Sequence, residues 1–154
     1  MQSIFAKLVI GLSITAIGIF AADNSLGTWK RNIDKSTGSG PRTVKSLTTV
    51  REASEGGVKV TTTGERMDGT AINSSYTGKY DGKEYPVTGA QWDTISIKQV
   101  NANTFTSETK KTGGKYHSKG RTVISKDGKT MTLTTKGTNA EGKPTRATIV
   151  SEKQ

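Results

Sequence analysis

The stretch Leu26-Gly27-Thr28-Trp29-Lys30-Arg31-Asn32 is the first strand-like run of the chain, and it follows an apolar leader. It contains a Gly-x-Trp motif, and the rest of the chain is a series of short runs rich in Thr, Ser, Val, Ile and Lys. Short β-favouring runs separated by turn residues predict an all-β sandwich or barrel. We therefore interpret everything downstream as strands that close onto residues 26–32.

The first 22 residues have the pattern of a secretory signal peptide. Residues 8–22 form an uncharged, mostly apolar run of 15 residues after a single lysine. Such a run is short for a membrane span but suits the apolar region of a signal peptide, with cleavage near Ala21 or Ala22. The position three residues before that cut lacks a small side chain, so an uncleaved N-terminal anchor is the alternative. We expect residues 23–154 to form one exported domain, either periplasmic or secreted.

The chain is strongly basic, with 23 Lys and Arg against 13 Asp and Glu, and it has no Cys. Removal of the leader takes away only Lys7, which leaves 22 basic and 13 acidic side chains and a net charge of +9. This charge makes weak binding to a polyanion or an anionic surface physically reasonable. The lysines alternate with Thr and Ser and form no basic block, however, as on an ordinary solvated surface. The absence of Cys excludes disulfides and a lipoprotein anchor.

About ten strands are predicted in the exported part, joined by tight turns. Asp-Gly pairs at 68–69, 81–82 and 127–128 lie between strand-like runs, and Asp-Gly suits the positive φ angles of tight hairpins. The longest flexible stretch is residues 34–41. No segment is long enough for a helical crossover, so the pattern predicts an antiparallel up-and-down barrel of about 8–10 strands. The strands are expected at residues 26–32, 43–52, 57–64, 70–80, 83–88, 94–100, 103–111, 115–125, 129–136 and 144–152.

Alternation along each strand assigns side chains to the inner or the outer face of the barrel. The inner faces combine large apolar side chains with many Ser and Thr hydroxyls. A barrel of eight or more strands has an interior that must be filled, and small hydroxyl side chains leave part of it open. We therefore predict a cavity of mixed polarity; the alternative is that the hydroxyls lie near the barrel ends and bond to the backbone. The candidate pocket residues are Tyr76, Tyr80, Phe105 and Tyr116.

The sequence offers no constellation for catalysis or for metal binding. Its single histidine, His117, falls on an outer face, and without Cys we expect no zinc site. No nucleophile–base–orienter set is evident, and the acidic residues lie mainly in turns. Stacking of nucleic-acid bases requires exposed aromatic side chains, for which only Tyr85 and Trp92 are candidates. We expect no catalytic residue, no cofactor and no specific nucleic-acid partner.

Residues 26–30, Leu-Gly-Thr-Trp-Lys, resemble the start of the barrel in the calycin superfamily, which contains the lipocalins and the fatty-acid-binding proteins. Residues 127–133 and 151–153 also look like the fatty-acid-binding C-terminus. The resemblance implies a lipocalin-like barrel in which Trp29 closes one end beneath a basic side chain from near the C-terminus, for which Arg146 is the candidate. The chain is also similar to small exported bacterial lipocalin-like proteins of unassigned activity.

The chain departs from the fatty-acid-binding pattern in two places. That family inserts two helices after its first strand, whereas only the loop at residues 34–41 follows here. Its Arg-x-Tyr carboxylate clamp falls on Ile149-Val150-Ser151 in this sequence. The resemblance therefore does not imply a fatty-acid carboxylate as the ligand.

Taken together, the patterns predict a monomeric, exported, non-enzymatic barrel that binds a small apolar or amphipathic molecule in its interior. The alternative is an envelope-associated structural or interaction module that uses its basic outer face to bind a polyanion or an anionic surface. A third hypothesis, an isomerase or hydrolase on the same barrel, lacks evident acid–base groups.

Overall fold

The computed structural model describes residues 22–38, 40 and 43–154. The predicted signal peptide lies outside the described residues except for Ala22. Within the described part of the chain, no helix is long and apolar enough to cross a membrane. The strands are β1 (Gly27–Gly38), β2 (Val44–Ser54), β3 (Gly57–Arg66), β4 (Ala71–Lys79), β5 (Asp81–Thr88), β6 (Thr94–Asn101), β7 (Thr104–Lys110), β8 (His117–Ile124), β9 (Thr130–Thr138) and β10 (Pro144–Lys153).

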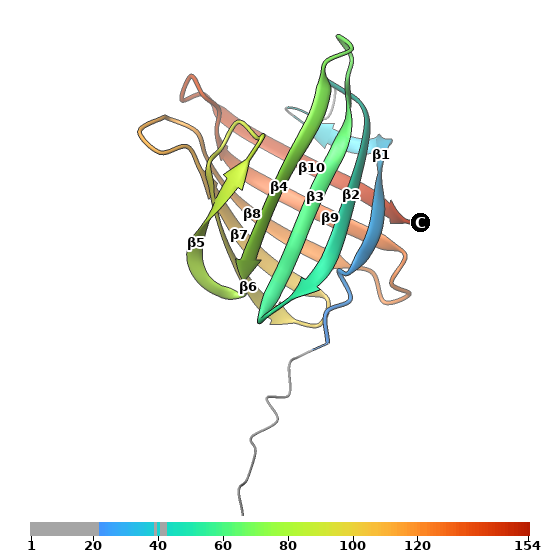
Figure 1. Cartoon of the computed structure of the whole chain (residues 1–154). Helices are drawn as coiled ribbons and strands as arrows, with labels where there is room; N and C mark the ends of the chain where they lie inside the picture. Colours follow the sequence, from blue (N-terminus) through green and yellow to red (C-terminus); the bar gives the residue numbers. More distant parts are fainter. Residues whose placement is uncertain (1–21, 39, 41–42) are drawn as a thin grey trace, which may run out of the picture.

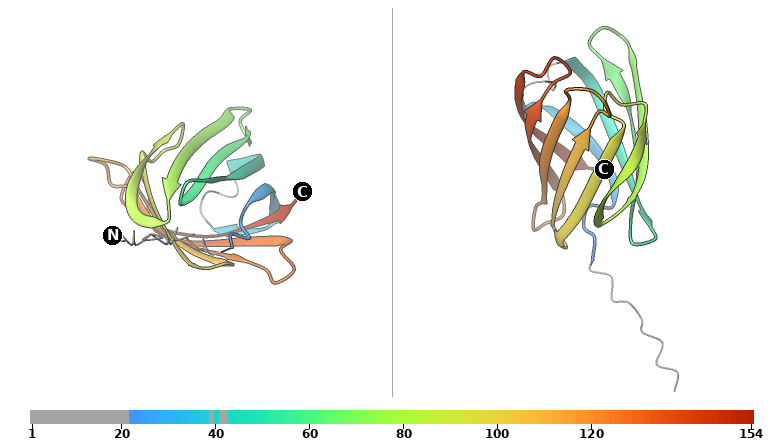
Figure 2. Two further views of the ribbon diagram at one scale, coloured as in Figure 1. Left: turned by 60° about the horizontal axis from the view of Figure 1, so that its bottom comes forward. Right: turned by 90° about the vertical axis from the view of Figure 1, so that its left-hand side faces the viewer.

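The ten strands form one closed antiparallel barrel (Figures 1 and 2). Each strand pairs with its neighbours in the sequence, and β1 closes the ring against β10, with Trp29 opposite Lys153. The predicted all-β up-and-down barrel is confirmed. Strand order also fixes the position of each turn, because consecutive strands run in opposite directions.

The barrel has two different ends. The turns after β2, β4, β6 and β8 lie at the end where β1 begins, which we call the closed end (bottom of Figure 1). The turns after β1, β3, β5, β7 and β9 lie at the opposite end, which we call the mouth. A residue's place within its strand therefore decides which end it belongs to.

The Asp-Gly turns have the geometry that the sequence predicts. Gly69 has a φ of 84°, and the Asp68 carboxylate accepts a hydrogen bond of 2.9 Å from the Thr70 backbone N–H. The Asp127 carboxylate does the same for the N–H of Lys129, at 3.0 Å. A positive φ costs glycine little, and the aspartate satisfies a backbone donor that the turn would otherwise leave open.

The first strand is longer than predicted, since β1 continues to Gly38 through the stretch expected to be a loop. Its register with β10 shifts between Asn32 and Thr37. The Ser36 hydroxyl donates to the Asn32 carbonyl at 2.6 Å and lies 3.1 Å from the Val150 backbone nitrogen, whose N–H it accepts. One side chain thus replaces the missing ladder bond, which lets a polar, turn-like sequence remain in the sheet.

The predicted alternation is confirmed by burial in two apolar clusters. One contains Val58, Val60, Val87, Ile95 and Ile97 on β3, β5 and β6. The other, at the closed end, contains Trp29, Phe105 and Ile124. Neither cluster reaches across the middle of the barrel, where smaller side chains line the interior.

Candidate functional site

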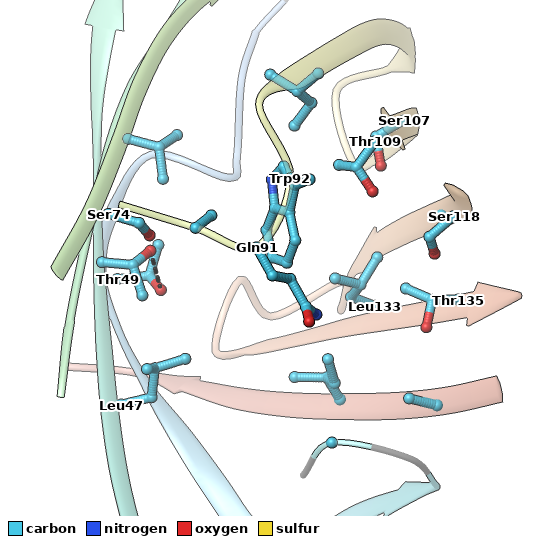
Figure 3. Close-up of a pocket in the computed structure, with 18 of the residues that line it drawn as sticks. Leu47, Thr49, Ser74, Gln91, Trp92, Ser107, Thr109, Ser118, Leu133 and Thr135 are labelled. Atoms are coloured by element: carbon cyan, nitrogen blue, oxygen red, sulfur yellow. Dashed lines mark hydrogen bonds between the residues drawn. The ribbon is translucent and has the colours of Figure 1, made fainter. Parts of the chain in front are cut away.

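The barrel interior holds a cavity of about 610 Å³ that extends from Trp29 toward the mouth. Hydroxyl side chains from β4, β7, β8 and β9 face it, together with apolar ones such as Leu47 and Leu133 (Figure 3). On the wall formed by β2 and β3, the paired residues Thr49 and Thr62 bond to each other through their hydroxyls at 3.2 Å. The cavity therefore has the mixed polarity that the sequence predicts. The labelled hydroxyl residues are Thr49, Ser74, Ser107, Thr109, Ser118 and Thr135.

Three of the four predicted pocket aromatics line the cavity: Tyr76, Phe105 and Tyr116. Tyr80 does not line it. The Tyr80 ring instead packs on Phe105, with centroids 5.3 Å apart, at the closed end. Its assignment to the pocket was wrong because alternation gives the face of the sheet but not the height along the barrel, and Tyr80 belongs to the turn after β4.

A hydrogen-bonded network seals the closed end. The Tyr80 hydroxyl donates to the Asp23 carboxylate, which also accepts from the Ser25 hydroxyl at 2.5 Å. Ser25 in turn accepts from Arg51 Nε at 3.0 Å through its hydroxyl and from Trp29 Nε1 at 2.7 Å through its carbonyl. Burial, and then the bond to Asp23, raise the pKa of the Tyr80 phenol well above its ordinary value. Each of these buried groups has a partner, so this end is a structural plug.

Trp29, the residue expected to close the barrel, is 1 % exposed and packs with Phe105 and Ile124 at the closed end. The basic side chain over its ring is Lys153, whose Nζ lies 5.2 Å from the ring centroid. Arg146 was the wrong candidate for this position. Arg146 lies near the start of β10 and pairs with Lys136 toward the mouth, whereas Lys153 is the last residue of β10.

At the mouth, the segment between β5 and β6 carries Gln91 and Trp92 into the cavity (Figure 3). The Trp92 ring stacks on Tyr116, with centroids 5.5 Å apart and an interplanar angle of 17°. The Asp93 carboxylate accepts bonds of 2.9 and 3.0 Å from the backbone and hydroxyl of Thr112, which joins the two turns that carry these rings. Those bonds lower the pKa of Asp93.

Trp92 is therefore a cavity residue and not an outer platform for nucleic-acid bases. Tyr85, the other candidate platform, is half-buried, and its ring lies against Gly78, where an added Cβ would be 3.2 Å from the Tyr85 Cδ2 atom. β4 and β5 pair only at Ser75 with Thr88 and at Tyr76 with Val87. The Tyr85 ring lies beside Gly78, where the two strands are not paired. Neither ring is available for base stacking on the outer face.

Arg31 is a charged cavity residue that the sequence patterns did not single out. It lies on the inner face of β1, two residues after Trp29, and pairs across with Ser151 of β10. Its Nε atom is buried and has no hydrogen-bond partner, and burial lowers the pKa of its guanidinium. The signal was present in the sequence, since alternation from Trp29 places residue 31 inside.

The acidic and histidine side chains form no metal site in the described residues, where no group of three or more His, Cys, Asp or Glu comes together. His117 lies on the outer face as predicted, and its Nε2 is 2.5 Å from a Glu108 carboxylate oxygen. That bond is the main cause of the lowered pKa of Glu108. The two side chains lie outside the cavity beside Lys110, so their bond is a surface contact.

The chain matches no protein-family model and no curated protein. Its structure is similar to that of the zebrafish ileal bile acid-binding protein complexed with cholic acid, with a TM-score of 0.50 and 14% identity over 86% of this chain and 99% of that one. It is also similar to EF1p2_mFAP2b bound to DFHBI, with a TM-score of 0.47 and 10% identity over 85% of this chain and 94% of that one. At 14% identity, the likeness to the bile acid-binding protein shows the fold alone, a closed ten-stranded antiparallel barrel.

Proposed function

We propose that this protein is an exported, non-enzymatic carrier that binds one small, partly apolar molecule inside the barrel. The observation that supports this most is the cavity of about 610 Å³, since small-molecule sites in proteins typically occupy about 300–1,000 Å³. Its lining is mainly apolar and aromatic with dispersed hydroxyls, which is the composition of such sites.

The two ends of the barrel support the same proposal. The closed end has a bonded plug built around Trp29, while the mouth carries the stacked rings of Trp92 and Tyr116 beside the cavity. A ligand entering at the mouth would meet flat apolar surface first. The bile acid-binding protein holds cholic acid on a barrel of the same fold, which supports a carrier role by fold analogy alone.

A neutral fluorescent probe, phenylnaphthylamine, tests the proposal together with native mass spectrometry. We expect one probe per protein and a rise in fluorescence that depends on the cavity. The variant Ser107→Phe fills space beside Gly120 and Ile97, its partners across β8 and β6, and should weaken binding roughly tenfold or more because it occupies the volume that the probe needs.

The matched control is Thr106→Phe, which places the same ring on the outer face of β7, between Lys98 and Arg121. It should bind the probe like the wild-type protein. Absence of probe binding by a folded wild-type barrel would overturn the carrier proposal, and so would equal binding by both variants.

A second candidate function rests on the outer face. Lys119 of β8 is directly opposite Lys136 of β9, and its other neighbour across the sheet is Glu108 of β7. Like charges directly opposite each other destabilise a sheet, so the Lys119–Lys136 pair suits binding of a polyanion or an anionic surface. Retention on heparin that falls with the double substitution Lys119→Gln and Lys136→Gln, and with added salt, would support this function. Retention that the substitution leaves unchanged would exclude this pair as its basis.

A further inference from the structure

The charged side chains that line the cavity are all positive. Among the described residues, the inner-face lining includes Arg31, Arg51 and Arg66 and contains no Asp, Glu or Lys. Arg146 also borders the cavity at the mouth, but its register with Lys136 places it on the outer face of the sheet. Charges of one sign in a partly enclosed, low-dielectric space attract a ligand of the opposite sign. Arg66 and Arg146 lie toward the mouth, whereas Arg31 and Arg51 lie near the closed end.

The two deep arginines differ in how their charge is balanced. Arg51 donates from Nε to the Ser25 hydroxyl at 3.0 Å, and that hydroxyl is bonded to the Asp23 carboxylate. Arg31 Nε is buried, and no described residue accepts its hydrogen bond. A buried donor or charge without a partner lowers the stability of the folded chain. Arg31 Nε is such a donor, whereas Arg51 Nε has a hydrogen-bond partner.

A second buried donor without a hydrogen-bond partner lies in the same cavity. The Trp92 indole Nε1 is buried without a hydrogen-bond partner among the described residues. Arg31 Nε and Trp92 Nε1 are the two such buried side-chain atoms in this part of the chain, and both residues line the cavity. No other buried side-chain donor of the described residues lacks a partner. The unsatisfied side-chain donors are therefore concentrated where a ligand would lie.

We propose that the ligand is an amphipathic anion whose acidic group, a carboxylate, sulfate or sulfonate, pairs with Arg31 while its apolar body extends toward Trp92 and Tyr116. This proposal rests on the carrier function and adds the charge and the direction of the ligand. A guanidinium binds such a group through charge-assisted hydrogen bonds, which are roughly twice as strong as neutral ones. The ring of Trp92 provides apolar contact at the other end, and its N–H can donate to an oxygen of the ligand.

Two probes that differ in one group test the proposal. Anilinonaphthalene sulfonate and phenylnaphthylamine share the same aromatic body, and only the first carries an anion. We expect the wild-type protein to bind both at a ratio of one per chain, and to bind the sulfonate more tightly. Equal affinity for the two probes would overturn the anion proposal while leaving the carrier function intact, whereas failure of both to bind would overturn the carrier function itself.

The variant Arg31→Met removes the charge and keeps much of the apolar stem. It should weaken binding of the sulfonate roughly 10- to 100-fold, the loss expected for a hydrogen bond to a charged group, and change binding of the neutral probe less than about threefold. It should also raise the melting temperature of the ligand-free protein, because it removes a buried donor that has no hydrogen-bond partner among the described residues. Unchanged sulfonate affinity in this variant would assign the anion to another group and overturn the proposal.

The matched control is Lys30→Met, which removes a positive charge from the adjacent, exposed residue of the same strand. This variant should bind both probes like the wild-type protein, and a loss of sulfonate binding equal to that of Arg31→Met would show that net charge alone is responsible. Should Arg31→Met not fold, Arg31→Gln tests the same charge with a polar side chain. Trp92→Phe should weaken both probes to a similar extent, since it alters the apolar end and not the charged one.

Discussion

The two tryptophans of this barrel occupy opposite ends and have opposite hydrogen-bonding states. Trp29 at the closed end is fully buried, and its Nε1 donates to the Ser25 carbonyl at 2.7 Å. Trp92 at the mouth is half-buried, and its Nε1 has no partner among the described residues. A group with all of its bonds made inside the protein contributes to the fold, whereas a buried donor without a partner points toward a ligand.

The same contrast separates Arg51 from Arg31. Arg51 belongs to the plug at the closed end through its bond to Ser25. Arg31 faces the cavity, two residues beyond Trp29 along β1. The difference teaches that the polar groups of the closed end are bonded within the chain, whereas those of the cavity include donors left open, as the proposed binding function requires. The following experiments test that division, in order of expected effect.

Replacing each tryptophan by alanine should show most clearly how the two ends of the barrel differ in their contribution to stability. Trp29→Ala should lower the free energy of unfolding by about 3–5 kcal/mol, the usual cost of removing a fully buried Trp. Trp92→Ala should lower it by about 1 kcal/mol, the worth of a lost aromatic pair, and should weaken binding of phenylnaphthylamine. Urea unfolding followed by far-ultraviolet circular dichroism measures both. Equal destabilisation by the two substitutions would contradict the division of roles.

Tyr80→Phe tests the plug through its pH dependence. The substitution should lower the free energy of unfolding by about 1.5–3 kcal/mol at neutral pH, because the Asp23 carboxylate loses a hydrogen bond. The pKa of Tyr80 is raised in the folded protein, so its contribution is fully present below about pH 10, where the unfolded phenol titrates, and declines as the pH rises further.

The stability difference between the wild-type protein and Tyr80→Phe should therefore shrink between about pH 10 and pH 11.5. Urea titrations of both proteins at several pH values measure it, and the comparison cancels the effect of lysine deprotonation. A difference that stays constant across this range would show that the phenol is not stabilised in its protonated form by the plug.

The smallest effect concerns the basic side chain above Trp29. Lys153→Met should lower the free energy of unfolding by about 0.5–1 kcal/mol, since the ammonium group lies over the indole ring at a partly exposed site. Lys115→Met removes an exposed lysine at the mouth and should change stability by less than about 0.5 kcal/mol. Thermal unfolding of the two variants side by side decides whether the contact with Trp29 stabilises the plug.

Much of the fold could be predicted from the sequence, because its signals are local. Asp-Gly turns and alternating side chains gave ten strands with nearly the observed bounds and the correct inner faces. The first strand was the main exception: residues 34–38 look like a loop, but the long-range bond between Ser36 and Val150 and the pairing of Thr37 and Gly38 with β10 keep β1 in the sheet. A contact over that sequence distance leaves no local pattern.

The site was harder to predict because alternation separates inside from outside but not the closed end from the mouth. Tyr76 and Tyr80 share a face, yet one lines the cavity and the other belongs to the plug. Counting strands would have separated them, because turns after even-numbered strands share an end with Trp29. The same count excludes Arg146 from the Trp29 end and favours Lys153. The exact depth of Arg31 depends on the stagger of the strands, which sequence patterns do not give.

The pairing of Trp29 with Lys153 has a consequence for how the protein folds. Nine of the ten seams join strands that are adjacent in the sequence and need only short turns to form, whereas the β1–β10 seam joins residues more than a hundred positions apart. Loop-closure entropy makes such a long-range pairing slow. Ring closure is thus expected as the late step of folding, and Arg31, which pairs with Ser151 in that seam, acquires its binding geometry only then. A nascent chain lacking β10 would have hairpins but no closed barrel around the cavity.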